Sequence, residues 1–177
     1  MSAASTLYNE TFQLMKDVIN YIIVTYGTQK IHYSVIVYSE TASIEIKFGQ
    51  TPPSPQQLKT VVENLDIGTG TPDLAAALRK ASEMFDDDER RPLTRKVLVI
   101  MADSSSGSTV DDVKTAAKPL VDTDVLVIPV VVGEEGDPDE LVNTTPDKTN
   151  VIETGKETDP EVVGEKIMDK IRGRKGN

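Results

Sequence analysis

Hydrophobic residues recur along this chain with two spacings, which predict helices alternating with strands. From residue 10 to 26 apolar side chains recur at helical spacing, and Asn9 is placed to cap that helix. Residues 31–38 form a mostly apolar run rich in β-branched side chains, which is typical of a buried strand. Residues 42–48 alternate between apolar and polar positions, which predicts a half-exposed antiparallel strand at the edge of a sheet.

The rest of the chain repeats this alternation. Continuous apolar strands between amphipathic helices indicate a mostly parallel sheet covered on both faces. We therefore expect a Rossmann-like α/β fold with one antiparallel edge strand. It should form a single domain over residues 1–172, followed by a frayed basic tail at 173–177. Further helices are predicted around 58–65, 74–85, 110–120, 137–143 and 160–171, and further strands at 96–101, 124–133 and 150–154.

Composition removes several classes of function. Among the 177 residues there is no cysteine and one histidine, His32, which excludes thiol catalysis, disulfide scaffolds and zinc sites built from several such residues. The formal net charge of −10 repels phosphate backbones, so we expect no nucleic-acid partner. No apolar run approaches the roughly 20 residues that span a bilayer, so we expect no membrane insertion.

Candidate chemistry lies where strands end. In an open α/β sheet, ligands bind beyond the carboxyl ends of the parallel strands. Asp103 follows the strand at 96–101, and Thr71 precedes the helix that starts near residue 74. With a further serine they would form an oxygen-only site suited to Mg²⁺, Mn²⁺ or Ca²⁺. In the purely structural alternative, Thr71 caps that helix, with Pro72 at its first position, and Asp103 only forms a turn.

Three segments in this order resemble one family. They are IHYSVIVYSETASIEIKF at 31–48, GTGTPDLAAALRKA at 68–81 and KVLVIMADSSSGS at 96–108. From about residue 5 to residue 172 the chain resembles a von Willebrand factor type A domain. The resemblance implies that Asp103 is the family's metal-site aspartate and Thr71 its metal-site threonine, with Thr69 as the less favoured register. Ala102 and Ser104 depart from the family's usual threonine and glycine.

The resemblance is weakest at the start of the chain. The family's metal site opens with Asp-x-Ser-x-Ser at the end of a first, central strand, whereas this chain begins MSAAST. Aligning either Ser5 or Thr6 with the last serine leaves one carboxylate and one hydroxyl without a counterpart. We therefore expect an incomplete metal-ion-dependent adhesion site of Ser5, Thr71 and Asp103, with weak or absent binding of Mg²⁺ (or Mn²⁺ or Ca²⁺).

The same comparison predicts that the central first strand is missing. Either a gap should separate the strand at 31–38 from that at 96–101, or the two should collapse directly onto each other. The exposed sheet edge would then be able to pair with another chain.

The resemblance implies a non-enzymatic protein-binding module of an extracellular matrix or adhesion type. The domain would be secreted as part of a larger protein and would bind a protein ligand that presents a carboxylate to the metal. Sequons at Asn9 and Asn143 agree with export.

Two alternatives remain open. In the first, the chain is a Rossmann-like nucleotide-binding enzyme that uses GTGT at 68–71 as an anion loop, although neither G-x-x-x-x-G-K-[ST] nor G-x-G-x-x-G occurs. In the second, it is a truncated domain with no metal function. A serine triad is disfavoured because His32 opens its strand at the opposite end of the sheet from Ser104–Ser106.

Overall fold

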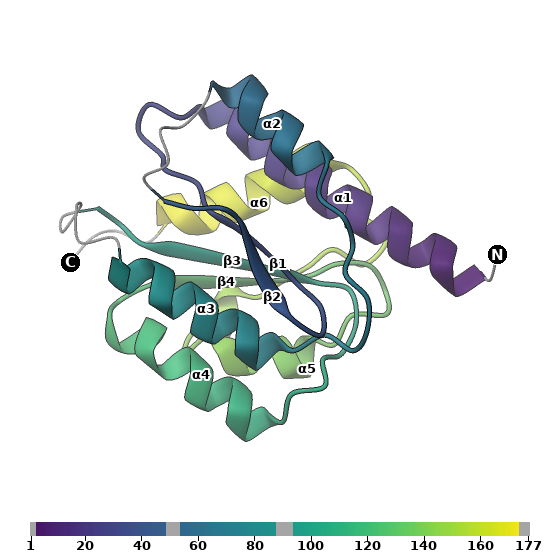
Figure 1. Cartoon of the computed structure of the whole chain (residues 1–177), viewed down its shortest axis with the longest axis vertical. Helices are drawn as coiled ribbons and strands as arrows, with labels where there is room; N and C mark the ends of the chain where they lie inside the picture. The colour runs from purple at the N-terminus through teal and green to yellow at the C-terminus, as the bar shows by residue number, and fades with distance from the viewer. Residues whose placement is uncertain (1–2, 49–53, 88–93, 174–177) are drawn as a thin grey trace.

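The computed structural model describes residues 3–48, 54–87 and 94–173, with the side chains of residues 3–8 and of Asp87 left out (Figure 1). Helices and strands alternate along most of the chain, as the hydrophobic pattern predicts. In chain order the elements are α1 (Ala3–Tyr26), β1 (Val35–Tyr38), β2 (Ala42–Ile46), α2 (Pro55–Glu63), α3 (Leu74–Asp87), β3 (Val97–Ala102), α4 (Val110–Asp122), β4 (Leu126–Val131), α5 (Pro138–Leu141), two 3₁₀ turns (Val142–Thr144 and Lys148–Asn150), β5 (Ile152–Glu153) and α6 (Pro160–Gly173).

The strands form two sheets. β3, β4 and β5 are parallel in the order β3-β4-β5, with Val97 opposite Leu126 and Val130 opposite Ile152. β1 and β2 form a separate antiparallel hairpin. In the described part of the chain β1 pairs with β2 alone and β3 with β4 alone. The predicted gap is therefore confirmed, and the direct pairing of the two strands is not what occurs.

Helices cover both faces of the strands, which confirms the predicted α/β fold class. α1 and α6 pack on one face, and α3 and α4 pack on the other (Figure 1). Each face has its own hydrophobic cluster, because side chains of successive strand residues point to opposite faces. α2 lies against α1 and closes a third cluster with β1 and β2.

The element boundaries differ from prediction at several places, including those of α1, β1 and α6. α1 starts at Ala3, so Asn9 lies inside the helix rather than capping it; residues 3–9 contain no glycine or proline to stop the helix earlier. β1 starts only at Val35, where its pairing with Ile46 of β2 begins; ahead of it the Tyr33 hydroxyl donates to the carbonyl of Gly27 at 3.0 Å. At the other end α6 continues to Gly173, and the remainder of the predicted basic tail, 174–177, lies outside the described residues.

Within the described ranges, no helix is both long enough and apolar enough to cross a membrane.

Candidate functional site

The loops that follow β1 and β3 meet at one edge of the molecule. The backbone N–H of Asp73 donates to the carbonyl of Ser39 at 2.8 Å, which joins loop 68–73 to the end of β1. The N–H of Gly107 donates to the carbonyl of Pro72 at 2.7 Å, which joins the same loop to the segment after β3. Because both strands end beside one loop, their carboxyl ends lie at the same edge, where α/β folds bind ligands.

The glycines of loop 68–73 allow it to pack closely on the turn between β1 and β2. A Cβ on Gly68 would lie 2.1 Å from the Ser39 hydroxyl oxygen. Gly70 has a φ of +86°, and its Cβ would lie 2.8 Å from a carboxylate oxygen of Glu40. A positive φ with no room for a side chain requires glycine. These glycines therefore have a packing role that needs no bound phosphate.

Asp73, and not Thr71, caps α3. The helix begins at the next residue, and Asp73 Oδ1 accepts a hydrogen bond from the N–H of Ala76 at 2.8 Å. The prediction that Thr71 caps this helix, with Pro72 in its first turn, is therefore wrong. Aspartate is as good a cap as threonine, and here Oδ1 of Asp73 also accepts from the Ser108 hydroxyl at 3.0 Å. The consequence is that the exposed hydroxyl of Thr71 is free of the helix terminus.

Asp103 comes directly after β3 with its side chain half-buried. Its Oδ2 accepts a hydrogen bond from the hydroxyl of Thr11 on α1, and Oδ1 accepts a long one, 3.4 Å, from Ser104. Asp103 thus also ties α1 to the end of β3. No local motif marks Thr11, because 92 positions separate it from its partner.

A second carboxylate, that of Glu140 in α5, holds the serine-rich loop after β3. It accepts hydrogen bonds from the backbone N–H of Ser106 at 2.8 Å and from the Ser106 hydroxyl. Burial raises the pKa of the neighbouring Tyr38 phenol, and the charges of Glu140 and Asp103 raise it further. From sequence Glu140 is predicted only as part of a short helix, since its contact with a loop 34 positions away leaves no local signal.

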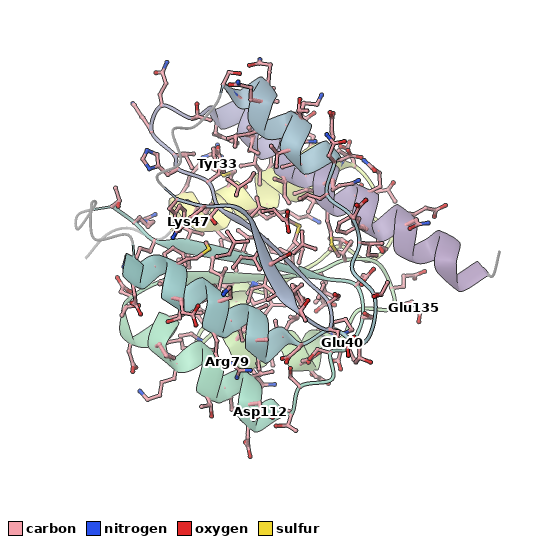
Figure 2. The ribbon with its side chains drawn as sticks, in the orientation of Figure 1. Tyr33, Glu40, Lys47, Arg79, Asp112 and Glu135 are labelled. Atoms are coloured by element: carbon pink, nitrogen blue, oxygen red, sulfur yellow. The ribbon has the colours of Figure 1, made fainter. Side chains whose placement is uncertain are left out.

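This edge carries further acidic side chains. Glu40 follows β1 and Glu135 follows β4, and Figure 2 shows both near the same end of the molecule. Asp137 caps α5 and accepts from the Ser105 hydroxyl at 3.2 Å. Such a concentration of one sign of charge raises the local concentration of cations.

The structure brings two of the three predicted site residues to this edge. Thr71 lies beside the loop after Asp103: a Cβ on Gly107 would come within 3.0 Å of Thr71 Cγ2. Ser5 lies in the first turns of α1, and its side chain falls outside the described residues.

The oxygen donors of the predicted ligands at this edge, Thr71 and Asp103, suit a hard cation but carry little charge. Carboxylate and hydroxyl oxygens are ligands for Mg²⁺, Mn²⁺ or Ca²⁺, not for soft metals. Of the predicted ligands only Asp103 is charged. Where the structure describes side chains, no three His, Cys, Asp or Glu residues gather in a way that could hold a metal ion. The oxygen atoms of Thr71 and Asp103 are of the kind that such an ion prefers, but they supply one negative charge between them.

His32 lies ahead of β1, whereas Ser104–Ser106 follow β3 at the edge where β1 ends. Because this is the chain's single histidine, the serine loop has no imidazole base at hand.

Similar solved structures share the fold over nearly all of this chain. Proximal thread matrix protein 1 from the mussel byssus superposes with a TM-score of 0.80 at 19% identity, over 92% of this chain and 42% of that one. A von Willebrand factor type A protein from Catenulispora acidiphila gives 0.74 at 18% identity, over 95% and 39%. Manganese-loaded TRAP protein of Plasmodium vivax gives 0.69 at 14% identity, over 86% and 65%. This chain thus spans about two fifths of the first two.

The family model described as the von Willebrand factor type A domain matches residues 4–163. That match includes nearly all of α1, both sheets and the loops that carry Thr71 and Asp103. The chain therefore belongs to the von Willebrand factor type A domain family.

Proposed function

We propose that this chain is a non-enzymatic protein-binding module of an extracellular matrix or adhesion type, acting outside the cell as part of a larger protein. The observation that carries the proposal is that the loop holding Thr71 packs on the segment that follows Asp103, at the carboxyl edge of β3 and among acidic side chains. The descriptions of two similar structures support the proposal. One is a matrix protein of the mussel byssus with a zinc-occupied metal-ion-dependent adhesion site (MIDAS) motif, and the other is a manganese-loaded protein of Plasmodium vivax.

In this proposal Thr71 and Asp103 hold a divalent ion, with Ser5 as a further hydroxyl ligand. The ion would supply a positive centre that attracts a carboxylate of the partner protein. Within the chain, the Thr11 hydroxyl orients the Asp103 carboxylate, and Glu140 holds the serine loop in place beside it. With a single charged ligand we expect Mg²⁺ or Mn²⁺ to bind only in the millimolar range.

Titration calorimetry with Mn²⁺ tests the site. Asp103→Ala should abolish the binding, whereas Asp86→Ala should leave it unchanged, because Asp86 is an exposed aspartate near the opposite end of α3. Equal losses in both variants would instead indicate diffuse attraction by the net charge. Micromolar binding by the wild-type chain would contradict an incomplete site.

Acetate tests the role of the partner's carboxylate. If a carboxylate completes the ion's ligand shell, acetate should strengthen Mn²⁺ binding, and Mn²⁺ should strengthen acetate binding by the same factor. Coupling that survives in Asp103→Ala would overturn the assignment. Absence of both Mn²⁺ binding and coupling in the wild type would favour the alternative of a domain without metal function.

A further inference from the structure

Two sequons of this chain have no part in the metal site. One is Asn9-Glu10-Thr11 on α1, and the other is Asn143-Thr144-Thr145, which begins in the 3₁₀ turn after α5. In exported chains an N-linked glycan is attached to the side-chain amide of the asparagine in such a triplet. Because a glycan is bulky and polar, the folded domain must present the modified amide to solvent. The two sequons differ in this respect.

Asn9 points away from the body of the domain. Figure 1 shows the N-terminal end of α1 projecting beyond the sheets, and the side chains of Asn9 and Glu10 are both exposed. Thr11 is two residues further on, about 200° around a helix with 3.6 residues per turn. It faces the domain, because its hydroxyl donates to Asp103 and a Cβ on Gly133 would lie 3.2 Å from its methyl carbon. The phase of the helix therefore directs Asn9 to solvent.

The side-chain amide of Asn9 is also unoccupied. Across the ranges that the structure describes, it takes part in no hydrogen bond. A glycan attached there replaces an amide hydrogen that only water contacts. Folding of the modified chain would therefore cost no internal hydrogen bond.

The amide of Asn143 is occupied. Its Nδ2 donates to the backbone carbonyl of Asp139 at 2.7 Å and to that of Glu140 at 3.4 Å, which satisfies carbonyls at the end of α5. The amide nitrogen carries two hydrogens, and an N-glycan replaces one of them. Asn143 is half-buried, and the next residue, Thr144, is 0% exposed. A glycan on Asn143 would therefore remove a hydrogen bond and displace a packed turn.

We propose that Asn9 is an N-glycosylation site and that Asn143 carries no glycan in the folded protein. In the reaction, Nδ2 of Asn9 forms a bond to carbon C1 of an oligosaccharide that is linked to a lipid through a diphosphate. The bond between C1 and the diphosphate oxygen breaks, and one amide proton is lost. This assignment rests on the extracellular location in the proposed function, but it needs no bound metal.

The position of Asn9 also indicates what its glycan would cover. Asn9 lies roughly 3 Å along the helix axis from Thr11, so the glycan would begin beside the edge that carries Asp103, on the solvent face of α1. Loop 68–73 packs on the segment after β3 instead. The glycan would thus cover the projecting turns of α1 and leave loop 68–73 open to a partner.

Expression of the full chain behind a cleavable secretory leader in a eukaryotic cell tests the site. Peptide-N-glycosidase F in H₂¹⁸O converts each glycosylated asparagine into aspartate labelled with ¹⁸O, which peptide mass spectrometry locates. In the secreted protein we expect label at Asn9 and none at Asn143. Secretion with Asn9 unlabelled, or with both positions labelled to the same extent, would overturn the proposal.

Two matched variants follow the glycan on a gel. Asn9→Gln removes the acceptor and should abolish the mobility shift that the glycosidase reverses, whereas Asn143→Gln should keep it. A shift that survives in Asn9→Gln would contradict the assignment. Protein that stays inside the cells without a glycan would overturn both this assignment and the extracellular location. Secreted protein without a glycan at Asn9 would overturn this assignment alone.

Thermal melts of the chain made without glycans test the structural argument. Asn143→Gln moves the amide away from the carbonyls of Asp139 and Glu140 and should lower Tm by about 2–4 °C. Asn9→Gln changes an exposed side chain and should stay within about 1 °C of the wild type. Equal changes in Tm would show that the two amides are equally engaged and would overturn the distinction between the sequons.

Discussion

β4 and β3 have similar sequences but different surroundings. β4 reads LVIPVV and is buried at all six positions, whereas β3 reads VLVIMA and is buried only at Ile100. β4 has a hydrogen-bonded strand on both sides; β3 has one on a single side in the described chain. A continuous apolar run thus indicates that a strand can be buried on both faces. It does not indicate how many strands will be hydrogen-bonded to it, which depends on the rest of the fold.

The largest expected effect comes from a matched pair of valines in one cluster. Val130 of β4 is 0% exposed, and Val99 of β3 is half-buried in the same cluster. Val130→Ala should lower the free energy of unfolding by about 2 kcal/mol, from lost transfer free energy and a residual cavity. Val99→Ala should cost less than half of that by urea denaturation. Equal costs would show that β3 is as enclosed as β4 and would break the comparison.

A smaller effect is expected where loop 68–73 joins the two sheets. Asp73→Ala removes the cap of α3 and the bond to Ser108, and should cost about 1 kcal/mol in unfolding free energy. Thr71→Ala is the control, because Thr71 is exposed and does not cap the helix, and its Tm should stay within about 1 °C of the wild type. If Thr71→Ala proves as costly as Asp73→Ala, the capping assignment is incorrect.

The smallest effect concerns Glu165 of α6, whose carboxylate accepts hydrogen bonds from Tyr21 and Tyr26 of α1 and so helps to attach the two helices. Hydrogen bonds donated by Tyr26 and Tyr21, and the nearby Arg172, lower the pKa of Glu165 below its usual value. A carboxylate whose folded pKa is depressed contributes stability above its unfolded pKa, and this contribution is lost as pH falls through the folded pKa.

Thermal melts at pH 7 and pH 3 measure this contribution. The Tm of the wild type should fall between pH 7 and pH 3, in part because Glu165 becomes protonated. Glu165→Gln removes that part, so the Tm of this variant should fall less. Glu161→Gln, which changes an exposed glutamate in the first turn of the same helix, should change the difference less. The same pH dependence in both variants would show that Glu165 does not fasten α1.

Prediction from sequence succeeded for elements whose hydrophobic residues recur with a clear period. It failed where contacts between residues far apart in the sequence determine the structure. The apolar run before Asp103 and the amphipathic pattern after Asp73 predict β3 and α3 to within a few residues. The N-terminal end of α1 was placed several residues too late, because a cap residue such as Asn9 is equally acceptable inside a helix that nothing stops. The cap of α3 was misplaced for a tertiary reason, since Ser108 holds the carboxylate of Asp73.

The residues of the candidate site fall into the same two groups, those that sequence could predict and those that only the structure revealed. Thr71 and Asp103 were predicted from strand ends and family resemblance, and both lie at the edge where β1 and β3 end; their role as metal ligands stays a prediction. Thr11 and Glu140 carry no local signal, because each acts on a partner far away in the sequence. Whether Ser5 acts with them stays a prediction.

Sequence alone determined the fold class of this protein. The features that predict it need no knowledge of contacts: apolar strands alternate with amphipathic helices, cysteine is absent, and two loop motifs follow in order. Only the tertiary structure decided that the strands form two separate sheets, that Asp73 rather than Thr71 caps α3, and that Thr11 holds Asp103. The reason is physical. Periodicity records which face of an element is buried, whereas pairing and hydrogen bonding between distant residues depend on which backbones come within reach after the chain has folded.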